Sequence, residues 1–288
     1  MCGIVGLHLR EPSLEPRLGE LLTAMLGQVV ERGPDSAGVA VYGDPRLSPP
    51  GRAVVSLLGV TPTEAEAALP GAVAVAADAT TVVHGDTDLL TAIQAALPHA
   101  TVIGSGVDMA VLKGTGNPVE LADAFGLSTV TGWQGVGHTR MATESAVTPE
   151  GAHPFSVGPG QCLVHNGSFA NHATIRRELR AQGVEFDSEN DSEVGARFIA
   201  HQLEQGADLE KALRLLCERF DGFYTLLVST GDSFAVVRDA IACKPALVAE
   251  TDAWVAMASE YRALDVLPGI EHARIFEPEP EEVYVWRR

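Results

Sequence analysis

The sequence begins MCGIVGLHL (residues 1–9), and this stretch decides the fold prediction. Residues 3–9 are apolar, as expected of a buried strand. Removal of the initiator Met is expected before a small second residue, and it leaves Cys2 with a thiol beside its own α-amine. A free α-amine titrates at about pH 7.7–8.0 and can accept the thiol proton, so one residue supplies both nucleophile and base. On its own, a cysteine at position 2 can also be an accident of composition.

Two later segments contain candidate functional residues, and each has a simpler structural explanation. HTRMAT (138–143) follows a predicted strand and contains Arg140. Its guanidinium can hold a substrate carboxylate through two hydrogen bonds, although a surface salt bridge is the commoner role of an arginine. In VHNG (164–167), Asn166 and Gly167 form an Asn-Gly pair, which by itself favours a turn. The same pair can form an oxyanion hole from the Asn amide and the next backbone N–H.

A third segment, NDSEV (190–194), precedes a helical pattern. The simpler explanation is that Asp191 or Ser192 is the N-cap of this helix. The functional alternative is that the Asp191 carboxylate accepts a substrate ammonium group. For each of the three segments taken singly, the structural explanation is the stronger one.

Hydrophobic periodicity predicts mixed α and β structure. Apolar residues recur on one helical face over 18–30, and Pro34 in RGPDSAG (32–38) ends this helix. From about residue 134, strands are punctuated by turns and helices come in blocks, which is typical of α+β layers. The expected strands of this part are 135–139, 161–165, 223–229, 233–238, 246–250, 254–258 and 272–275. The expected helices are 172–182, 192–205 and 208–219.

Residues 44–131 differ from the rest of the chain in charge and in their alternation of strand-like and helix-like runs, and they are predicted to form an acidic α/β insertion. Between Ala53 and Thr139, Lys113 is the only basic residue, against eight acidic ones. Strand-like runs alternate here with helix-like runs. The strand-like runs are 53–58, 72–76, 101–103 and 107–112, and the helix-like runs are 62–69, 87–97 and 117–125. The glycine-rich stretch 104–116 lacks the residue order of a phosphate-binding loop, so a turn-rich connection is expected.

Composition excludes several classes of function. The 288 residues include 38 acidic and 20 basic ones, which gives a net charge of −18. This charge repels nucleic acid and anionic lipid, so neither is expected as a partner. The sequence has no apolar run of membrane-spanning length and no signal-peptide pattern, which predicts a cytoplasmic protein.

The cysteines predict neither a metal site nor a disulfide framework. None of the four has metal-site spacing to another cysteine or to a histidine cluster, so no metal is expected. Cys162, Cys217 and Cys243 are expected to be buried packing residues. Cys243 lies nearest a predicted loop and is therefore the alternative reactive thiol.

The order of the motifs carries more information than any one of them. MCGIVG is followed by RGPDSAG, HTRMAT, AHPF (152–155), VHNG and NDSEV. In this order they resemble the class II glutamine amidotransferases, which are N-terminal-nucleophile hydrolases, and most closely the stand-alone subunits related to glutamate synthase and N-methylglutamate synthase. The resemblance covers roughly 1–43 and 132–285. It implies one amidotransferase domain over 1–288, an α+β, four-layer αββα sandwich with the inserted acidic α/β segment at about 44–131.

The resemblance also implies roles for the residues of the site. Cys2 corresponds to the nucleophile that attacks the glutamine amide, and Asn166 and Gly167 correspond to the oxyanion hole. The implied reaction is hydrolysis of L-glutamine to glutamate and ammonia through a thioester on Cys2.

Further positions correspond to the residues that bind the rest of the substrate. Arg140 matches the arginine that binds the α-carboxylate, with Thr143 beside it. The Gly167 carbonyl and Asp191 match the acceptors of the α-ammonium. His153 lies in the matching His-Pro element, in a supporting role.

No cofactor is expected in this chain. No acceptor domain follows the sandwich, so we expect ammonia to pass to a separate synthase subunit, glutamate synthase-like or N-methylglutamate synthase-like, within a hetero-oligomer. By family analogy alone, that partner carries FMN and an iron–sulfur cluster.

Two departures from the family pattern leave other functions open. Glu144 stands where synthase-type members often have histidine, and residues 44–131 exceed the usual connection. Both features fit a catalytically quiet regulatory or scaffold subunit. A further alternative is an N-terminal-nucleophile amidase that acts on a different amide.

Overall fold

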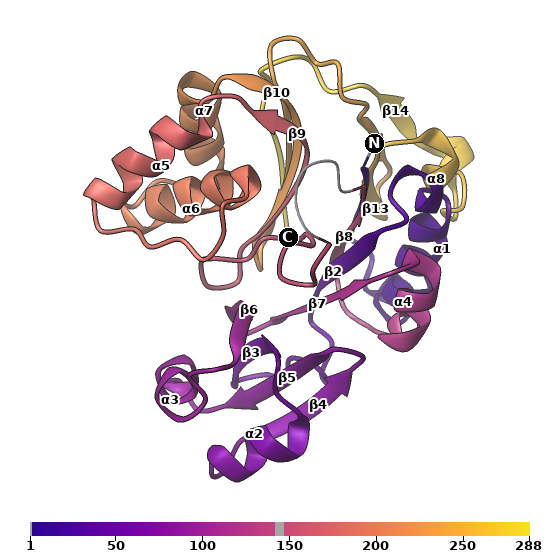
Figure 1. Ribbon diagram of the computed structural model, residues 1–288. Coiled ribbons are helices and arrows are strands. Elements are labelled where there is room, and N and C mark those ends of the chain that lie inside the picture. The colour runs from indigo at the N-terminus through magenta and orange to yellow at the C-terminus, as the bar shows by residue number, and fades with distance from the viewer. Residues whose placement is uncertain (1, 142–146) are drawn as a thin grey trace.

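Two antiparallel sheets face each other in the computed structural model, which describes residues 2–141 and 147–288 (Figure 1). The first sheet has seven strands, in the order β14 (Arg274–Phe276), β12 (Leu247–Glu250), β13 (Trp254–Ala258), β1 (Gly3–Leu9), β8 (Gln134–Arg140), β2 (Ser36–Tyr42) and β7 (Met109–Thr115). The second has four strands, in the order β15 (Tyr284–Arg287), β11 (Ser233–Arg238), β10 (Gly222–Ser229) and β9 (Cys162–Phe169).

Helices cover the outer face of each sheet. The first sheet is covered by α1 (Leu18–Gly27), α4 (Pro118–Ala124) and α8 (Tyr261–Leu264). The second is covered by α5 (His172–Ala181), α6 (Asp191–Glu204) and α7 (Leu209–Arg219). The predicted α+β, four-layer αββα sandwich is therefore confirmed. Among the described residues, no helix has both the length and the apolar character needed to cross a membrane.

The inter-sheet layer explains why the N-terminal stretch is apolar and contains glycine. Ile4 of β1 belongs to the same buried cluster as Val164 of β9 and Leu227 of β10. A Cβ atom on Gly6 would overlap the Leu227 side chain. The two sheets approach so closely here that the strand needs a residue without a side chain.

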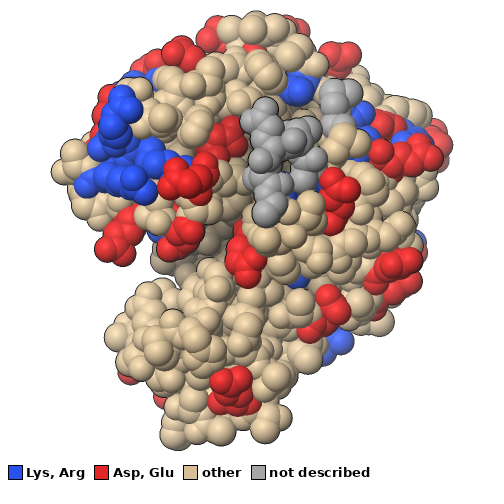
Figure 2. Space-filling view, viewed as in Figure 1, with Lys and Arg blue, Asp and Glu red and all other residues tan. Residues whose placement is uncertain are grey.

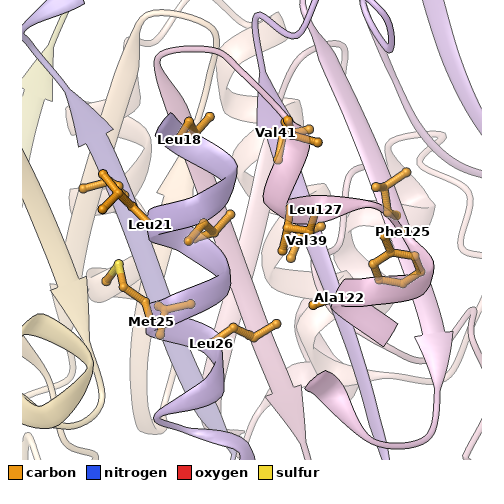
Figure 3. Close-up of a cluster of buried hydrophobic side chains, with 14 of the residues drawn as sticks. Leu18, Leu21, Met25, Leu26, Val39, Val41, Ala122, Phe125 and Leu127 are labelled. Carbon is orange, nitrogen blue, oxygen red and sulfur yellow. The ribbon is translucent and has the colours of Figure 1, made fainter. Parts of the chain in front are cut away.

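The face of α1 predicted from periodicity packs on the first sheet. Figure 3 shows Leu18, Leu21, Met25 and Leu26 on this helix, beside Val39 of β2. Burial of each such side chain contributes roughly 1.5–3 kcal/mol.

The helix is shorter than the sequence predicted. It ends at Gly27, and a separate turn of 3-10 helix, Val30–Arg32, follows it. Val29 is nevertheless fully buried. The apolar pattern therefore continued past the end of the helix because these residues still face the core.

A third sheet forms a lobe at the bottom of Figure 1. Its strands lie in the order β4 (Val73–Ala77), β5 (Thr80–Gly85), β3 (Ala53–Leu58) and β6 (Thr101–Gly106), with helices α2 (Pro62–Ala68) and α3 (Leu89–Ala96). The lobe therefore spans 53–106, which is narrower than the predicted insertion at 44–131. β7 pairs with β2 in the first sheet and α4 packs near α1, so both belong to the sandwich.

The lobe covers the edge of the first sheet. Ser56 Oγ accepts a hydrogen bond from Val111 N at 2.9 Å, and Thr80 Oγ1 accepts one from Lys113 N at 3.2 Å. Val111 and Lys113 lie on the edge strand β7, whose outward backbone groups would otherwise lack partners. Side-chain hydroxyls of the lobe thus replace the missing neighbouring strand.

The charge pattern of the insertion also has a structural basis. Lys113 is buried, its Nζ lies 5.0 Å from the centre of the Phe155 ring, and burial lowers its pKa to about 8. Residues 53–106 contain no Lys or Arg. Figure 2 accordingly shows a lobe surface that is mostly uncharged, with scattered acidic side chains.

Three buried histidines link the two sheets. His138 Nε2 of β8 lies 3.1 Å from the carbonyl oxygen of His165 on β9. His153 stacks on His138 with 4.1 Å between ring centres, and its Nδ1 accepts a hydrogen bond from His165 N at 3.3 Å. Burial lowers the pKa of His138 to about 3 and that of His165 to about 4, and it also lowers the pKa of His153. All three rings are therefore neutral near pH 7.

The first prediction concerns the covered edge. Ser56→Ala and Thr80→Ala each leave a buried N–H of β7 without its acceptor, so each should lower the free energy of unfolding by about 1–3 kcal/mol. Chemical denaturation measures this change, and Thr87→Ala, at an exposed position of the same lobe, is the control. Wild-type stability in both variants would mean that hydrogen bonds from the β7 N–H groups to these hydroxyls do not stabilise the fold.

The second prediction concerns the buried histidines. Their pKa values are lower in the folded than in the unfolded chain, where the ordinary value is 6.5, so below pH 6.5 the unfolded chain binds more protons. The free energy of unfolding should therefore fall from pH 6.5 toward pH 4, by up to about 1.4 kcal/mol per pH unit for each histidine. Denaturation at several pH values measures this slope.

Comparison with variants isolates the histidine contribution from that of other groups. His138→Gln removes one titrating ring and keeps an N–H donor, so the slope should become shallower. His272→Gln, at an exposed position, should retain the wild-type slope. A His138→Gln slope equal to that of the wild type contradicts the prediction.

Candidate active site

Cys2 lies at the start of β1, and its backbone is held from two directions. Its carbonyl oxygen accepts hydrogen bonds from Arg32 Nε at 3.0 Å and from Asn166 Nδ2 at 3.2 Å. The Cys2 side chain is partly exposed, and its Sγ lies 4.0 Å from the carbonyl oxygen of Met141. A fixed backbone and an accessible thiol are what a nucleophile requires.

Arg32 is a site residue to which the sequence assigned no role. Its Nη1 forms a 2.9 Å ion pair with Glu260 Oε1, and Glu260 Oε2 lies 2.7 Å from Arg262 Nε. This pairing fixes the guanidinium that holds Cys2. Arg32 lies within RGPDSAG, which predicts the end of a helix and is one of the ordered family motifs. Neither interpretation gives Arg32 a role, and nothing in the sequence pairs it with Glu260, 228 residues away.

Asn166 and Gly167 lie inside β9 and not in a turn. The strand pairs with β10 in regular register, with Asn166 opposite Thr225 and Gly167 opposite Tyr224. Gly167 has a φ of 144°, and a Cβ there would overlap the carbonyl oxygen of Phe223. Only glycine fits this conformation and this close approach, so the local preference of Asn-Gly for a turn does not apply.

Arg140 lies at the end of β8 beside the start of β1. Gly3 pairs with Thr139, and continuing this antiparallel register brings Arg140 opposite Cys2. Directly opposite residues of an antiparallel pair project from the same face of the sheet. The Arg140 side chain is largely enclosed, with 6% of the residue exposed. Thr143, predicted beside it, and Glu144 lie outside the described residues.

Asp191 is the first residue of α6 and is bound to the end of β9. Its Oδ2 accepts a hydrogen bond from Phe169 N at 2.9 Å. The helix N-cap is Asn190, whose side chain accepts from Ser192 N at 2.9 Å, so neither Asp191 nor Ser192 is the cap. The helix dipole stabilises a carboxylate at this position.

His153 contacts the site through β9. Its hydrogen bond goes to the backbone N–H of His165, the residue before Asn166. His153 therefore supports the strand that carries Asn166 and Gly167. Cys2, Arg140, Asn166 and Gly167 come from two facing sheets, and Asp191 comes from the helix behind the second.

The other thiols differ in exposure. Cys162 is buried, and burial raises its pKa to about 12. Cys217 is half-buried, and burial raises its pKa too. Cys243 is exposed, unlike the buried packing residue that was predicted. Among residues 2–141 and 147–288, no three or more His, Cys, Asp and Glu side chains gather as metal ligands.

Comparison with known proteins shows the family to which the chain belongs. Residues 138–266 match the family described as "Glutamine amidotransferase domain". The chain is 46% identical to the glutamine amidotransferase-like protein GlxB of Rhizobium meliloti, over 99% of this chain and 98% of that one. It is 30% identical to a putative glutamine amidotransferase of Methanothermobacter thermautotrophicus, over 99% of each chain.

Solved structures show the same fold. The glutamine phosphoribosylpyrophosphate amidotransferase of B. subtilis matches 99% of this chain with a TM-score of 0.63 and 20% identity. This chain spans about half of that protein, at 49% of its length. The two full-length relatives and this shared fold lead to one conclusion: the chain belongs to the class II glutamine amidotransferases.

Proposed function

We propose that this protein hydrolyses the side-chain amide of L-glutamine to glutamate and ammonia, with the Cys2 thiol as nucleophile. The observation that carries the proposal is the hydrogen bond from Asn166 Nδ2 to the Cys2 carbonyl oxygen, which joins residues 164 positions apart. Nucleophile and oxyanion donor, as the family motifs assign them, are thus in direct contact across the two sheets.

The Asn166 amide can serve two purposes at once. A side-chain amide has two N–H donors. One holds the Cys2 carbonyl oxygen, which leaves the other for the oxyanion that forms on the substrate. The backbone N–H of Gly167 is the second proposed donor. Donors fixed in advance by a strand need no reorganisation as charge develops, and each typically contributes about 10²–10³-fold in rate.

The proposed reaction proceeds through a thioester. After removal of Met1, the Cys2 α-amine takes the thiol proton, and the sulfur attacks the amide carbon. The C–N bond then breaks, and the proton passes from the α-amine to the departing nitrogen, which leaves as ammonia. Water, deprotonated by the same amine, attacks the thioester, releases glutamate and restores the thiol.

We propose that the two charged groups of glutamine are bound separately. Arg140 holds the α-carboxylate, with Thr143 beside it, and Asp191 with the Gly167 carbonyl accepts the α-ammonium. A simple amide lacks both charged groups and would make neither contact, so its transition state would be bound more weakly than that of glutamine. This double requirement accounts for a preference for glutamine.

We further propose that the ammonia passes to a separate synthase subunit, glutamate synthase-like or N-methylglutamate synthase-like. In neutral water ammonia is mostly protonated and then has no lone pair for attack, which favours an enclosed transfer. In this proposal the synthase carries FMN and an iron–sulfur cluster, and this chain carries no cofactor.

The third prediction tests the nucleophile. Cys2→Ser should lower glutaminase kcat by at least about 10³-fold, because a hydroxyl is a far weaker nucleophile than a thiolate. Cys243→Ser, at the exposed cysteine, should keep wild-type activity. Release of glutamate is measured, and N-terminal sequencing establishes that Met1 has been removed.

The alternatives give different results in the same assay. Unchanged activity in Cys2→Ser excludes this residue as nucleophile. Wild-type protein that is inactive with and without a synthase favours a quiet subunit. Equal activity on glutamine and on unrelated amides favours an amidase of a different specificity.

A further inference from the structure

We infer that Ser192 and His165 are positioning residues that hold the Asp191 carboxylate toward the substrate ammonium and so determine specificity for an α-amino acid. This inference rests on the proposed function. Neither residue is assigned a role by the family motifs, although both lie inside them.

Both oxygens of Asp191 are hydrogen bonded to fixed groups. Oδ2 accepts from the backbone N–H of Phe169 at 2.9 Å, and Oδ1 accepts from Ser192 Oγ at 3.3 Å. Ser192 Oγ in turn lies 2.8 Å from His165 Nδ1. Ser192 and His165 are each 3% exposed, so water has little access to the bond between them. The carboxylate keeps further lone pairs with which it can accept an ammonium.

The hydrogen atoms in this chain of contacts have one consistent arrangement. A hydroxyl has a single hydrogen, and an ionised carboxylate can only accept. The Ser192 hydroxyl therefore donates to Asp191, and His165 donates its Nδ1–H to the Ser192 oxygen. His165 is thereby fixed as the Nδ1–H tautomer, and its buried Nε2 has no partner among the described residues.

The backbone of His165 is fixed as firmly as its ring. Its carbonyl oxygen is bound by His138 and its N–H by His153. His165 directly precedes Asn166 on β9. One residue therefore connects the proposed oxyanion donor on the strand with the ammonium acceptor at the start of α6. The bond between His165 and Ser192 is thus a second link between β9 and the start of α6, beside the hydrogen bond from Phe169 N to Asp191.

The test compares L-glutamine with glutaramate, which has the same amide and a carboxylate but no α-ammonium. Ser192→Ala removes the donor to Asp191. The KM for glutamine should rise about 10-fold or more, because a hydrogen bond to a charged group is lost. The kcat/KM for glutaramate should stay within about 2-fold of wild type. The preference for glutamine should thus fall about 10-fold.

Two substitutions at His165, one that keeps an N–H donor and one that removes it, provide a second, independent test. His165→Asn keeps an N–H donor near the Nδ1 position and should retain most of the preference for glutamine. His165→Phe keeps a ring against Phe169, with which His165 stacks at 4.4 Å, but has no donor and should reduce the preference as Ser192→Ala does. Ser229→Ala is the matched control, because this buried hydroxyl bonds Tyr42 at the far end of β10. It should change stability but not the preference.

The outcomes separate the inference from the function on which it rests. A wild type that does not hydrolyse glutamine overturns the proposed function. If the wild type is active and a folded Ser192→Ala keeps the full preference, the positioning role is wrong. If Ser192→Ala does not fold, the His165 pair decides, and equal preference in His165→Asn and His165→Phe overturns the inference.

Discussion

The hydrogen bond between the Asn166 side chain and the Cys2 carbonyl oxygen is the contact on which the proposed site depends. It joins the two sheets where β1 begins. Further along the same strand the sheets also approach closely, because a Cβ atom on Gly6 would overlap the Leu227 side chain. The Arg32 side chain donates a hydrogen bond to the same carbonyl oxygen and is itself held by an ion pair with Glu260. The fold thus provides the position of the thiol, and the second N–H of the amide remains for chemistry.

Much of the fold could be predicted because its elements follow local rules. Strand and helix ranges from apolar periodicity lie within a few residues of those observed for most elements, including β3, α6 and α7. β5 was missed, although its β-branched run at 80–83 was a usable signal. The predicted insertion at 44–131 is wider than the observed lobe. The distribution of charged and apolar residues along the sequence cannot show that β7 pairs with β2, or that β7 is the edge strand that the lobe covers.

The candidate site was less accessible to sequence reasoning. The ordered motifs predict site roles for Cys2, Arg140, Asn166 and Asp191. The turn that the Asn-Gly pair favours locally is wrong, because Asn166 lies in a strand. The supporting residues Arg32, His165 and Ser192 lie within the family motifs, but the motifs assign them no role. Their roles depend on contacts between distant segments, and no local pattern encodes these contacts. Burial of three histidines between and behind the sheets is likewise visible only in three dimensions.

The most direct measurement for the central claim is covalent labelling with a diazoketone analogue of L-glutamine, followed by peptide mass spectrometry. The analogue places a ketone carbon where the amide carbon of glutamine would lie and a diazo-bearing carbon where the amide nitrogen would lie. The thiol protonates the diazo-bearing carbon, and the thiolate then displaces dinitrogen from it to form a stable thioether. We predict that the adduct forms on Cys2, that its formation is slowed by L-glutamine, and that the exposed Cys243 remains unmodified. Labelling of Cys243 with Cys2 unmodified would contradict the assignment of Cys2 as nucleophile.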